Sequence, residues 1–351
     1  MNASRNRRAL PAALLALAAW SVAIPTPSLA AQGPGVVSSG FVFLDPPTPS
    51  CHASTVVETP RGLVAAWFGG TDEGEPDVSI YVARREGNAW SKPFQAFDGV
   101  QADGRRFPCW NPVLFRPEGG PLLLFAKVGP SPSAWWGVLS TSADDGATWT
   151  APRRLPDGVL GPIKNKPIAL PDGSLLCPTS REDAQLGWRV FLERTPDLGG
   201  SWTTVGPLND GKIIGAIQPS VLAHPGGRLQ VLCRSRQAKL AESWSSDGGR
   251  TWSPMTLTGL DNPNSGTDAV TLADGRHLLV YNPTTEGRTP LAVALSADGK
   301  DWTRAVTLED QPGEYSYPAV IQAGDGRVHV TYTWRRERIK HVILDPTALP
   351  R

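Results

Sequence analysis

The sequence predicts an all-β fold: one six-bladed β-propeller over residues 31–351, preceded by a leader segment at residues 1–30. Three observations predict it: a turn motif that recurs along the chain, a strand signal between its copies, and a composition with 13 Trp, 36 Gly and 34 Pro in 351 residues. Tight turns need Gly and Pro, and many short strands need many turns. A repeat at the period of a propeller blade therefore indicates the fold class.

The first thirty residues have the pattern of a secretory signal peptide. Arg5, Arg7 and Arg8 supply positive charge, and residues 9–24 are mostly apolar and uncharged. Small residues then precede a predicted cleavage site near Ala30. The apolar stretch is short for a membrane span of about twenty residues, so a membrane anchor is the less favoured alternative. We expect an exported protein without another membrane-crossing segment.

The turn motif has the form Ser-x-Asp-x-Gly-x-Thr-Trp. It occurs at residues 142–149, 195–202 and 245–252, in a version one residue shorter at 296–302, and without its Asp at 86–90. The Asp carboxylate can accept backbone N–H groups across a turn, and the Gly supplies a positive φ. The Trp can pack between neighbouring sheets. Each copy is predicted to join two outer strands of a blade.

A second strand signal lies between the motif copies, and each instance follows a turn that contains Gly. The six segments are residues 63–68, 122–125, 175–177, 229–233, 277–281 and 328–332. Six such strands predict six blades. Because a closed ring leaves fewer open sheet edges, we expect the last blade to be completed by an N-terminal strand near residues 41–44.

Composition excludes several classes of partner and site. The net charge is only +1, whereas a nucleic-acid binder normally carries a basic face. No phosphate-binding loop, metal-ligand cluster or Ser-His-Asp arrangement stands out, so we predict neither a cofactor nor a metal. Cys51, Cys109, Cys177 and Cys233 do not have zinc-site spacing, and both disulfides and buried free thiols remain open. The oligomeric state is also open.

The repeated turns resemble the Asp-boxes, or bacterial neuraminidase repeats, of the sialidase superfamily. The resemblance covers nearly all of residues 31–351 and implies the propeller fold. Asp-boxes also occur in propellers with other chemistry, so they do not determine the reaction. In sialidases, three arginines bind the substrate carboxylate, a Tyr paired with Glu is the nucleophile, and an Asp is the acid and base.

These functional positions are only partly matched here. Arg234 resembles the second arginine of the family, Arg288 the third, and Tyr315 the nucleophile. Gln218 stands where the family has its Glu, and His52 where it has its first arginine. Two guanidinium groups from adjacent blades can bind one carboxylate through charge-assisted hydrogen bonds. The resemblance therefore implies an acidic sugar as substrate: sialic acid, a related keto acid or a uronic acid.

Other groups are candidates for proton transfer. Gln218 has no useful basicity, so the tyrosine needs another base, and Asp268 is a candidate by its position before an apolar stretch. Asp72 and Glu73 lie in the acidic loop that resembles the acid-bearing loop of the family, and either could protonate a leaving group. His52 can act as general acid or base near neutral pH.

Three further residues are candidates for contact with the sugar. Asn111, before Pro112, stands where the family often has a substrate-contacting Asp. Lys164 and Lys166 lie before the inner strand of the predicted third blade, at a position that faces the axis. Two further pairs, Arg181 with Glu182 and Arg335 with Arg336, could be rim contacts or ordinary surface charges, and the surface interpretation is favoured.

The sequence leads to three functional hypotheses. The first is an exported exo-glycosidase of sialidase type that acts on a terminal acidic sugar of a glycan. The second is a uronate lyase, in which His52 and the tyrosine remove the proton next to a carboxylate held by arginines. The third is a propeller that binds an acidic glycan without cleaving it.

Overall fold

The computed structural model describes Met1 and residues 33–350. The chain divides into two units, Met1–Ala30 and Ala31–Arg351, and the propeller is the second. Apart from Met1, the predicted leader segment lies outside the described residues, so export stays a prediction. Among residues 33–350, no helix is long and apolar enough to cross a membrane.

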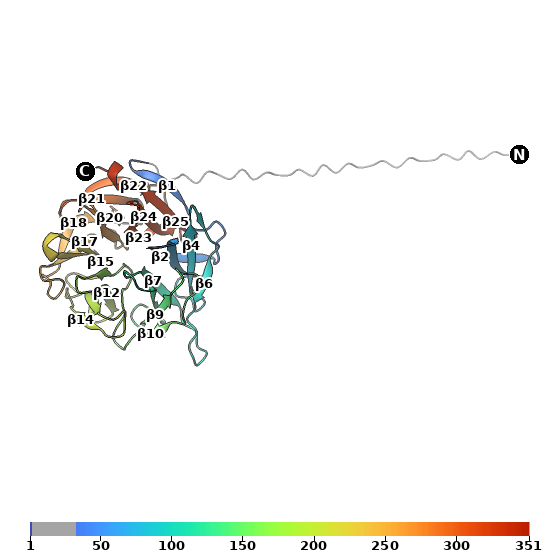
Figure 1. The fold of residues 1–351 in the computed structure, drawn as a ribbon, viewed down its shortest axis with the longest axis horizontal. Coiled ribbons are helices and arrows are strands. Elements are labelled where there is room, and N and C mark those ends of the chain that lie inside the picture. Colours follow the sequence, from blue (N-terminus) through green and yellow to red (C-terminus); the bar gives the residue numbers. More distant parts are fainter. Residues whose placement is uncertain (2–32, 351) are drawn as a thin grey trace. The chain divides into compact units, whose positions relative to one another are not determined.

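Six antiparallel sheets form the ring, which confirms the all-β, six-bladed prediction (Figure 1). Blades 1 to 3 are β2 (Ser50–Thr59), β3 (Gly62–Gly70), β4 (Ser79–Glu86), β5 (Ala89–Trp90) with β6 (Phe94–Phe97); β7 (Cys109–Phe115), β8 (Leu122–Val128), β9 (Trp136–Ser142), β10 (Arg153–Arg154); and β11 (Ile168–Ala169), β12 (Leu175–Asp183), β13 (Gly187–Thr195), β14 (Thr203–Val205). Blades 4 to 6 are β15 (Ala216–Ala223), β16 (Leu229–Ser235), β17 (Lys239–Ser245), β18 (Thr256–Asp261); β19 (Asp268–Thr271), β20 (His277–Tyr281), β21 (Leu291–Ser296), β22 (Thr303–Glu309); and β23 (Tyr315–Gln322), β24 (Val328–Trp334), β25 (Arg338–Leu344), β1 (Val36–Phe41). Two short 3-10 turns, Pro225–Gly227 and Pro346–Ala348, complete the described elements.

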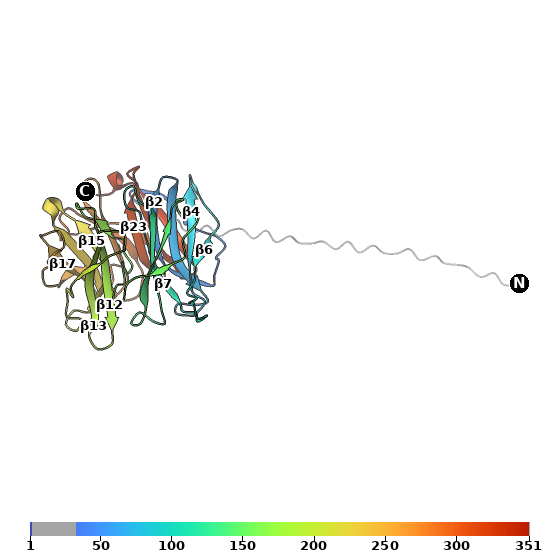
Figure 2. The same cartoon turned by 60° about the horizontal axis from the view of Figure 1, so that its bottom comes forward.

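The first strand of each blade lies nearest the axis. Strands β2, β7, β15 and β23 surround the centre in Figure 1, and the inner strands β2, β7 and β23 lie side by side in the tilted view of Figure 2. The six segments predicted as strands between the motif copies are all second strands: β3, β8, β12, β16, β20 and β24. The prediction of one such strand in each of six blades is therefore confirmed.

The ring closes between the two ends of the propeller unit. Strand β1 pairs antiparallel with β25, with Val36 opposite Leu344 and Phe41 opposite Lys340. Closure by an N-terminal strand was expected near residues 41–44, and the strand lies slightly earlier. The outer edge of blade 6 is thus covered by residues from the start of the unit.

The Asp-box turns join the third and fourth strands of their blades, as predicted. In the copy between β17 and β18, the Asp247 carboxylate accepts the N–H of Thr251 at 2.9 Å and the N–H of Arg250 at 3.0 Å. The Ser245 hydroxyl accepts the N–H of Gly249 at 2.9 Å, and Gly249 has the left-handed φ of +84° that the turn requires. Asp144, Asp197 and Asp298 make corresponding contacts.

The apolar core lies between the blades. Trp202 of one Asp-box meets Phe125 of the preceding blade edge-on, with ring centroids 6.4 Å apart. The same cluster joins Leu123 and Leu139 of blade 2 to Leu175 of blade 3. Neighbouring sheets are therefore held together by side chains that the repeat supplies at the same place in successive blades.

All four cysteines of the described propeller are buried and free. The alternative of buried thiols is the one that the structure shows. Burial raises the pKa of the Cys51 thiol to about 12, so this thiol is protonated and unreactive at neutral pH.

Four inner strands carry the same local irregularity at the axial end. Their register shifts lie between His52 and Thr55, Trp110 and Val113, Ile217 and Ser220, and Ser316 and Ala319. Each shift contains a residue other than Gly with positive φ: Ala53 (56°), Asn111 (35°), Gln218 (57°) and Tyr317 (50°). A bulge bends the strand and re-aims the side chains beside it, and such strained positions cluster at functional sites.

Candidate functional site

Tyr317 lies at the centre of a polar cluster built by blades 1, 4, 5 and 6. Its hydroxyl oxygen accepts hydrogen bonds from Nη1 of Arg234 at 2.7 Å and from Nε2 of Gln218 at 3.3 Å. The ring centroids of His52 and Tyr317 are 4.2 Å apart, and the guanidinium carbon of Arg288 lies 5.7 Å from the tyrosine ring. Both donors point at the phenolic oxygen, so they fix its position within the cluster.

A glycine allows this position of the ring. A Cβ added at Gly266, just before β19, would lie 3.2 Å from Cδ2 of Tyr317. Such a contact is tighter than packed side chains normally make, so a larger residue there would displace the ring.

The prediction that Tyr315 faces the arginines is wrong. Its ring is 1% exposed within the apolar cluster shared by blades 5 and 6. Among the described residues, its hydroxyl is hydrogen-bonded only to Nη2 of Arg335, at 3.4 Å. The bulge in β23 between Ser316 and Ala319 is the physical reason, because it re-aims the strand so that Tyr317, and not Tyr315, faces the cluster. The pair Tyr317-Pro318 repeats the pattern of Asn111-Pro112 and Gln218-Pro219 at the other bulges, and this signal could have identified Tyr317.

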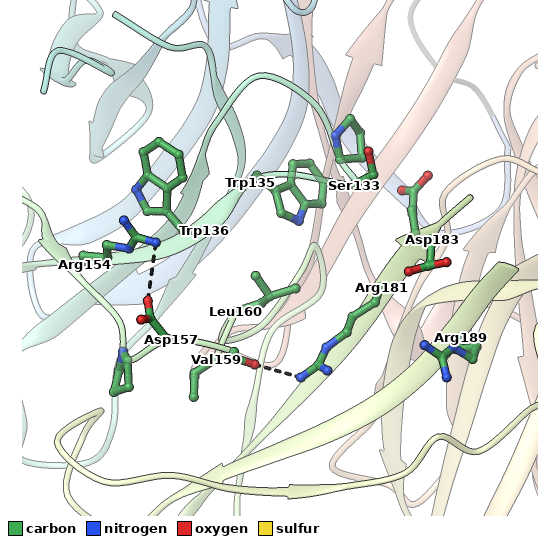
Figure 3. Close-up of a pocket in the computed structure, with 14 residues that line it drawn as sticks. Ser133, Trp135, Trp136, Arg154, Asp157, Val159, Leu160, Arg181, Asp183 and Arg189 are labelled. Carbon is green, nitrogen blue, oxygen red and sulfur yellow. Dashed lines mark hydrogen bonds and ion pairs between the residues drawn. The ribbon is translucent and has the colours of Figure 1, made fainter. Parts of the chain in front are cut away.

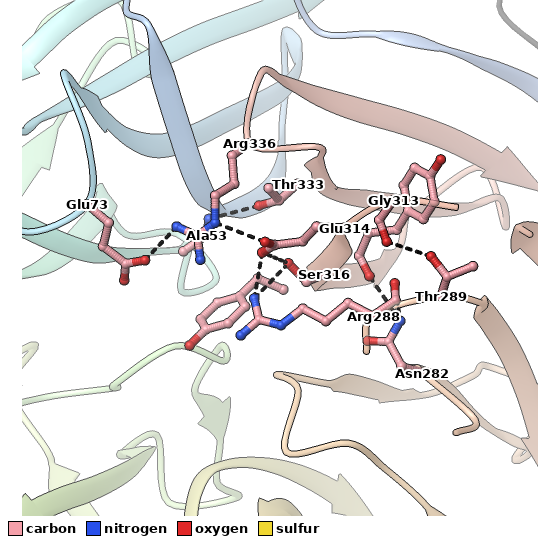
Figure 4. A network of polar contacts seen from close by, with 12 residues as sticks. Ala53, Glu73, Asn282, Arg288, Thr289, Gly313, Glu314, Ser316, Thr333 and Arg336 are labelled. Carbon is pink, nitrogen blue, oxygen red and sulfur yellow. Dashed lines mark hydrogen bonds and ion pairs between the residues drawn. The ribbon is translucent and has the colours of Figure 1, made fainter. Parts of the chain in front are cut away.

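A third guanidinium group joins the cluster from the turn between β24 and β25. Glu314 bridges Nη1 of Arg288 at 2.6 Å and Nε of Arg336 at 3.1 Å, and Arg336 also meets Glu73 at 2.6 Å (Figure 4). Burial raises the pKa of Glu314, but the two guanidinium groups outweigh it and hold this pKa below its usual range. The favoured interpretation of Arg336 as an ordinary surface charge is therefore wrong, and its two ion pairs fit the alternative of a contact at the rim of the site, where its backbone has a positive φ of 58°.

His52 is a buried, neutral imidazole. The residue is 1% exposed, and neither ring nitrogen has a hydrogen-bond partner among the described residues. Burial lowers its pKa well below the usual value, and the positive charges of Arg336, Arg288, Arg234 and Lys164 lower it further. The ring is therefore a weak base unless a bound anion offsets these positive charges.

Lys164 donates all its hydrogen bonds to groups of the protein, so it has none left for a ligand. Its Nζ meets Oδ1 of Asn165 at 2.8 Å, the carbonyl oxygen of Thr267 at 2.9 Å, and the carbonyl oxygen of Pro318. An ammonium group has three donors, so all are used. Burial lowers the pKa of Lys164 to about 7. The expected contact between this lysine and the sugar is not supported, because the lysine holds the backbone next to Tyr317.

Asp268 and Lys166 form a closed pair elsewhere in the ring. Nζ of Lys166 lies 3.0 and 2.9 Å from the two carboxylate oxygens of Asp268, which also accept Ser220 Oγ at 3.1 Å and Val320 N at 2.8 Å. Asp268 is 2% exposed. Its oxygens are occupied and make no contact with either tyrosine, so its predicted role as a substitute base is wrong. The charge of Lys166 is likewise neutralised by Asp268, so this lysine is not available to bind a sugar carboxylate.

The remaining predicted residues lie around the cluster. The exposed Asp72 accepts the N–H of Glu73 at 2.8 Å, whereas Glu73 pairs with Arg336. Asn111 is 5% exposed on its bulge, and its side chain makes no hydrogen bond within the described residues. Oε1 of Gln218 is buried without a partner there. Residues 33–350 contain no group of three or more His, Cys, Asp or Glu side chains that could hold a metal ion.

A cavity of about 330 Å³ lies beside the cluster, between blades 2 and 3 (Figure 3). Its wall includes the side chains of Trp135, Trp136, Arg181, Glu182 and Arg189. Burial raises the pKa of Glu182, although Arg234 and Arg236 oppose this effect.

Comparison with known proteins supports a common origin with sialidases. The model of the BNR repeat-like domain matches residues 61–330. An anhydrosialidase of Macrobdella decora is 26% identical over 237 residues, which are 58% of this chain and 30% of that protein. A sialidase of Micromonospora viridifaciens is 28% identical over 244 residues, 62% of this chain and 35% of that protein. The matched part is thus about a third of either relative's length.

The fold is also shared with solved structures. A protein of unknown function from Dyadobacter fermentans superposes with a TM-score of 0.75 at 17% sequence identity, over 89% of this chain and 99% of that chain. At this sequence identity, the similarity shows a shared fold only. The chemistry has to be argued from the side chains at the axial end of the propeller.

Proposed function

The chain belongs to the BNR repeat-like family of sialidase-superfamily propellers, and from this premise we propose that it is an exported glycoside hydrolase for a terminal acidic sugar. One observation carries the proposal: the guanidinium carbons of Arg234 and Arg288 lie 5.6 and 5.7 Å from the ring of Tyr317, and their charges, together with that of Arg336, lower the pKa of the adjacent His52. Three positive groups around a buried polar pair favour a ligand that carries a carboxylate.

The arginines retain donors for such a ligand. Arg288 pairs with Glu314 through Nη1 alone, and Nε of Arg234 is buried with no partner among the described residues. A guanidinium group has five N–H donors, so a substrate carboxylate can be added without breaking these pairs. Glu314 then orients Arg288 and Arg336 toward the ligand.

Tyr317 and His52 supply the reactive groups. Arg234 and Gln218 both donate to the phenolic oxygen, which fixes the hydroxyl within the cluster. Once a substrate carboxylate offsets the positive charges around it, the neutral His52 ring next to the tyrosine ring can take a proton from this hydroxyl or from a water molecule. The resulting nucleophile attacks the anomeric carbon while a nearby carboxyl group protonates the leaving oxygen.

A second candidate function is elimination by a uronate lyase, and one contact favours it. Tyr317 is paired with a neutral imidazole instead of a carboxylate. In elimination, a base removes the proton next to the substrate carboxylate, the arginines neutralise the charge that develops, and the oxygen on the next carbon leaves. His52 and Tyr317 suit the two proton transfers.

The test is a cleavage screen with sialosides, glycosides of related keto acids and uronate oligosaccharides. Hydrolysis releases a free acidic sugar, whereas elimination gives an unsaturated uronate with new ultraviolet absorbance. We expect Arg234→Gln to lower kcat/KM by about 100-fold, since a charge-assisted hydrogen bond is lost. The control is Arg61→Gln, an arginine with a 63% exposed side chain on the turn between β2 and β3. If the protein binds these glycans but cleaves none of them, the proposed hydrolase activity is wrong and the protein is a sugar-binding propeller.

A further inference from the structure

Two cavities lie at the axial end of the ring that is opposite the central cluster. Arg336 of that cluster belongs to the turn between the second and third strands of blade 6, whereas the Asp-box turns join third and fourth strands. Successive turns of an antiparallel sheet alternate between its two ends. The Asp-box turns, and the turns between first and second strands, therefore share the other end of the ring, which we call the Asp-box end.

Both cavities are lined by the Asp-box of blade 4. The first has a volume of about 430 Å³ and also contains Lys300, from the Asp-box of blade 5. The second, of about 510 Å³, lies between blades 3 and 4. Arg228 and Ser246 line both cavities, so the two adjoin along blade 4. Each volume is within the usual range for small-molecule pockets, so together they have room for a ligand of more than one unit.

Trp244 lines the first cavity and is not part of the repeat. The residue before the first Ser or Thr of the box is Thr141 in blade 2, Arg194 in blade 3 and Leu295 in blade 5. The box tryptophan of blade 4 is Trp252, which donates its indole N–H within the turn and packs against the apolar cluster of blades 3 and 4. The scaffold thus does not require a second indole here, and the half-exposed ring of Trp244 is available to a ligand.

The ring of Trp244 is supported by imidazole rings and flanked by two cations. It packs against His224 with ring centroids 4.8 Å apart, and His224 packs against His277 at 4.1 Å. The guanidinium carbon of Arg228 and Nζ of Lys300 lie 5.5 and 5.7 Å from the indole centroid. This arrangement suits a sugar that packs its apolar face on the indole and directs an anionic group to the cations.

The two cations are not neutralised by the protein. Within residues 33–350, Arg228 and Lys300 make hydrogen bonds only through their backbones, and neither side chain forms an ion pair. The described residues that line the first cavity include no acidic side chain. The box carboxylates of Asp247 and Asp298 accept N–H groups of their own turns. An anionic ligand therefore meets uncompensated positive charge at this cavity.

The second cavity adds a further cation. Its lining includes Arg250, whose guanidinium group donates to the backbone carbonyl oxygen of Asp247 at 3.3 Å and forms no ion pair in the described part of the chain. The other pair in this lining, Arg194 with Asp172, is neutral as a whole. Among the five copies of the motif, the residue after the box Gly is basic in blades 4 and 5 alone, as Arg250 and Lys300. The positive charge is therefore a property of these two blades and not of the repeat.

We infer that the Asp-box end carries a second ligand site, for an oligosaccharide with anionic groups. Trp244, Arg228 and Lys300 bind one anionic sugar, and Arg250 binds the next unit of the same chain. Carboxylate and sulfate groups both suit guanidinium and ammonium donors. The site binds its ligand without cleaving it, at the end of the ring that faces away from Tyr317.

The test is titration calorimetry with four probes: a short oligogalacturonate, a heparin-derived oligosaccharide, a neutral cello-oligosaccharide and a single-stranded DNA. All titrations use the Arg234→Gln variant, because the central cluster also favours a carboxylate. We expect at least one of the two anionic oligosaccharides to bind, with an affinity that falls as salt is added, and the neutral one not to bind. The anionic oligosaccharide that binds identifies the group as carboxylate or sulfate. Equal binding of the neutral chain, or of the DNA, would overturn the assignment to an anionic glycan.

Substitutions place the bound oligosaccharide. Arg228→Gln combined with Lys300→Gln should weaken binding at least about tenfold, since two charge-assisted contacts are lost. Trp244→Ala should weaken it about fivefold, and Trp244→Phe should restore most of the affinity because a ring is kept. The matched control is Arg61→Gln, whose exposed side chain lies at the same end of the ring in blade 1. Unchanged affinity in the double variant, at an unchanged melting temperature, would overturn the site.

Cleavage distinguishes this inference from the proposed function. With Arg234 intact, the variant that combines Arg228→Gln and Lys300→Gln should cleave a small acidic glycoside within about twofold of the parent rate, because both side chains lie away from the central cluster. If the parent cleaves no glycoside but binds an anionic oligosaccharide through these residues, the proposed function fails and the second site stands. If the parent cleaves acidic glycosides and the double variant binds oligosaccharides as the parent does, the second site fails and the proposed function stands.

Discussion

The outer turns and the inner bulges of the propeller use repetition in opposite ways. At the outer turns, Asp144, Asp197, Asp247 and Asp298 make the same contacts to their own backbone. At the four inner bulges, the equivalent places hold four different residues, Ala53, Asn111, Gln218 and Tyr317. The same backbone bulge thus carries a different side chain in each of these blades. The repeated scaffold fixes the position, and the side chain determines the chemistry.

The two regions also satisfy their charges differently. Asp247 is neutralised within its own turn, by backbone N–H groups and the hydroxyl of Thr251. Glu314, at the inner end, is neutralised by Arg288 from blade 5 and Arg336 from another turn of blade 6. Substitutions at the inner end should therefore change activity, and substitutions at the outer turns should change stability.

The largest expected effect separates two neighbouring tyrosines. Tyr317→Phe removes the hydroxyl that Arg234 and Gln218 contact and should lower kcat/KM by about 10² to 10⁴-fold, with little change in melting temperature. Tyr315→Phe is the matched control, because its hydroxyl has one long contact, to Arg335. The measurement is cleavage of the substrate found in the screen. A large loss in Tyr315→Phe together with full activity in Tyr317→Phe would reverse the assignment.

A smaller effect is expected at an outer turn. Ser245→Ala leaves the buried N–H of Gly249 without its acceptor and should lower the free energy of unfolding by about 1–2 kcal/mol. Because this turn lies away from the cluster, kcat/KM should stay within about twofold. Urea denaturation and cleavage assays on the same preparations check both. Lost activity in a stably folded variant would show that the two regions are coupled.

The last prediction concerns the pH range in which stability is lost, which differs between the buried histidines and the carboxylates of the outer turns. Burial lowers the pKa of His277 and His329 to about 4 and of His341 to about 3, so these rings stay neutral in the folded protein. Between about pH 6.5 and 4 the unfolded chain binds protons that the folded chain does not, so stability falls on acidification.

The outer carboxylates lose their contribution at lower pH. Hydrogen bonds from its own turn hold the pKa of Asp197 at about 2, and those of Asp247 have the same effect. Their stabilisation is complete above about pH 4 and is lost only as the pH falls toward 2. Calorimetric melts from pH 7 to 2 should show two successive declines. A melting temperature that stays constant between pH 6.5 and 4.5 would contradict neutral buried histidines.

The fold was predictable because its signals are local. The Asp-box contacts involve residues no more than four apart, and the second strands are apolar runs bounded by turns. The candidates Arg234, Arg288 and His52 came from the resemblance to the sialidase superfamily, and the structure brings them around one tyrosine.

The rest of the site depends on contacts between distant segments. Tyr317 replaces Tyr315 because a bulge changes the direction of the strand, and Arg336 enters because its turn has a positive φ. Lys164 and Asp268 carry charges suited to a site, but both are satisfied by groups from other blades. These side chains become buried and acquire their hydrogen-bond and ion-pair partners only when the ring is assembled. No single segment of the sequence therefore reveals them.

The closure of the ring has a consequence for how the chain reaches its final state. Val36, in the first strand, pairs with Leu344, in the last. The first strand can therefore pair only after the last strand has been synthesised and has folded. Until then, β25 presents an unpaired edge to other chains. Contacts of such high sequence separation slow folding, and an open edge favours association between partly folded molecules. Dilution during refolding should therefore raise the yield of monomeric propeller more than a change of temperature does.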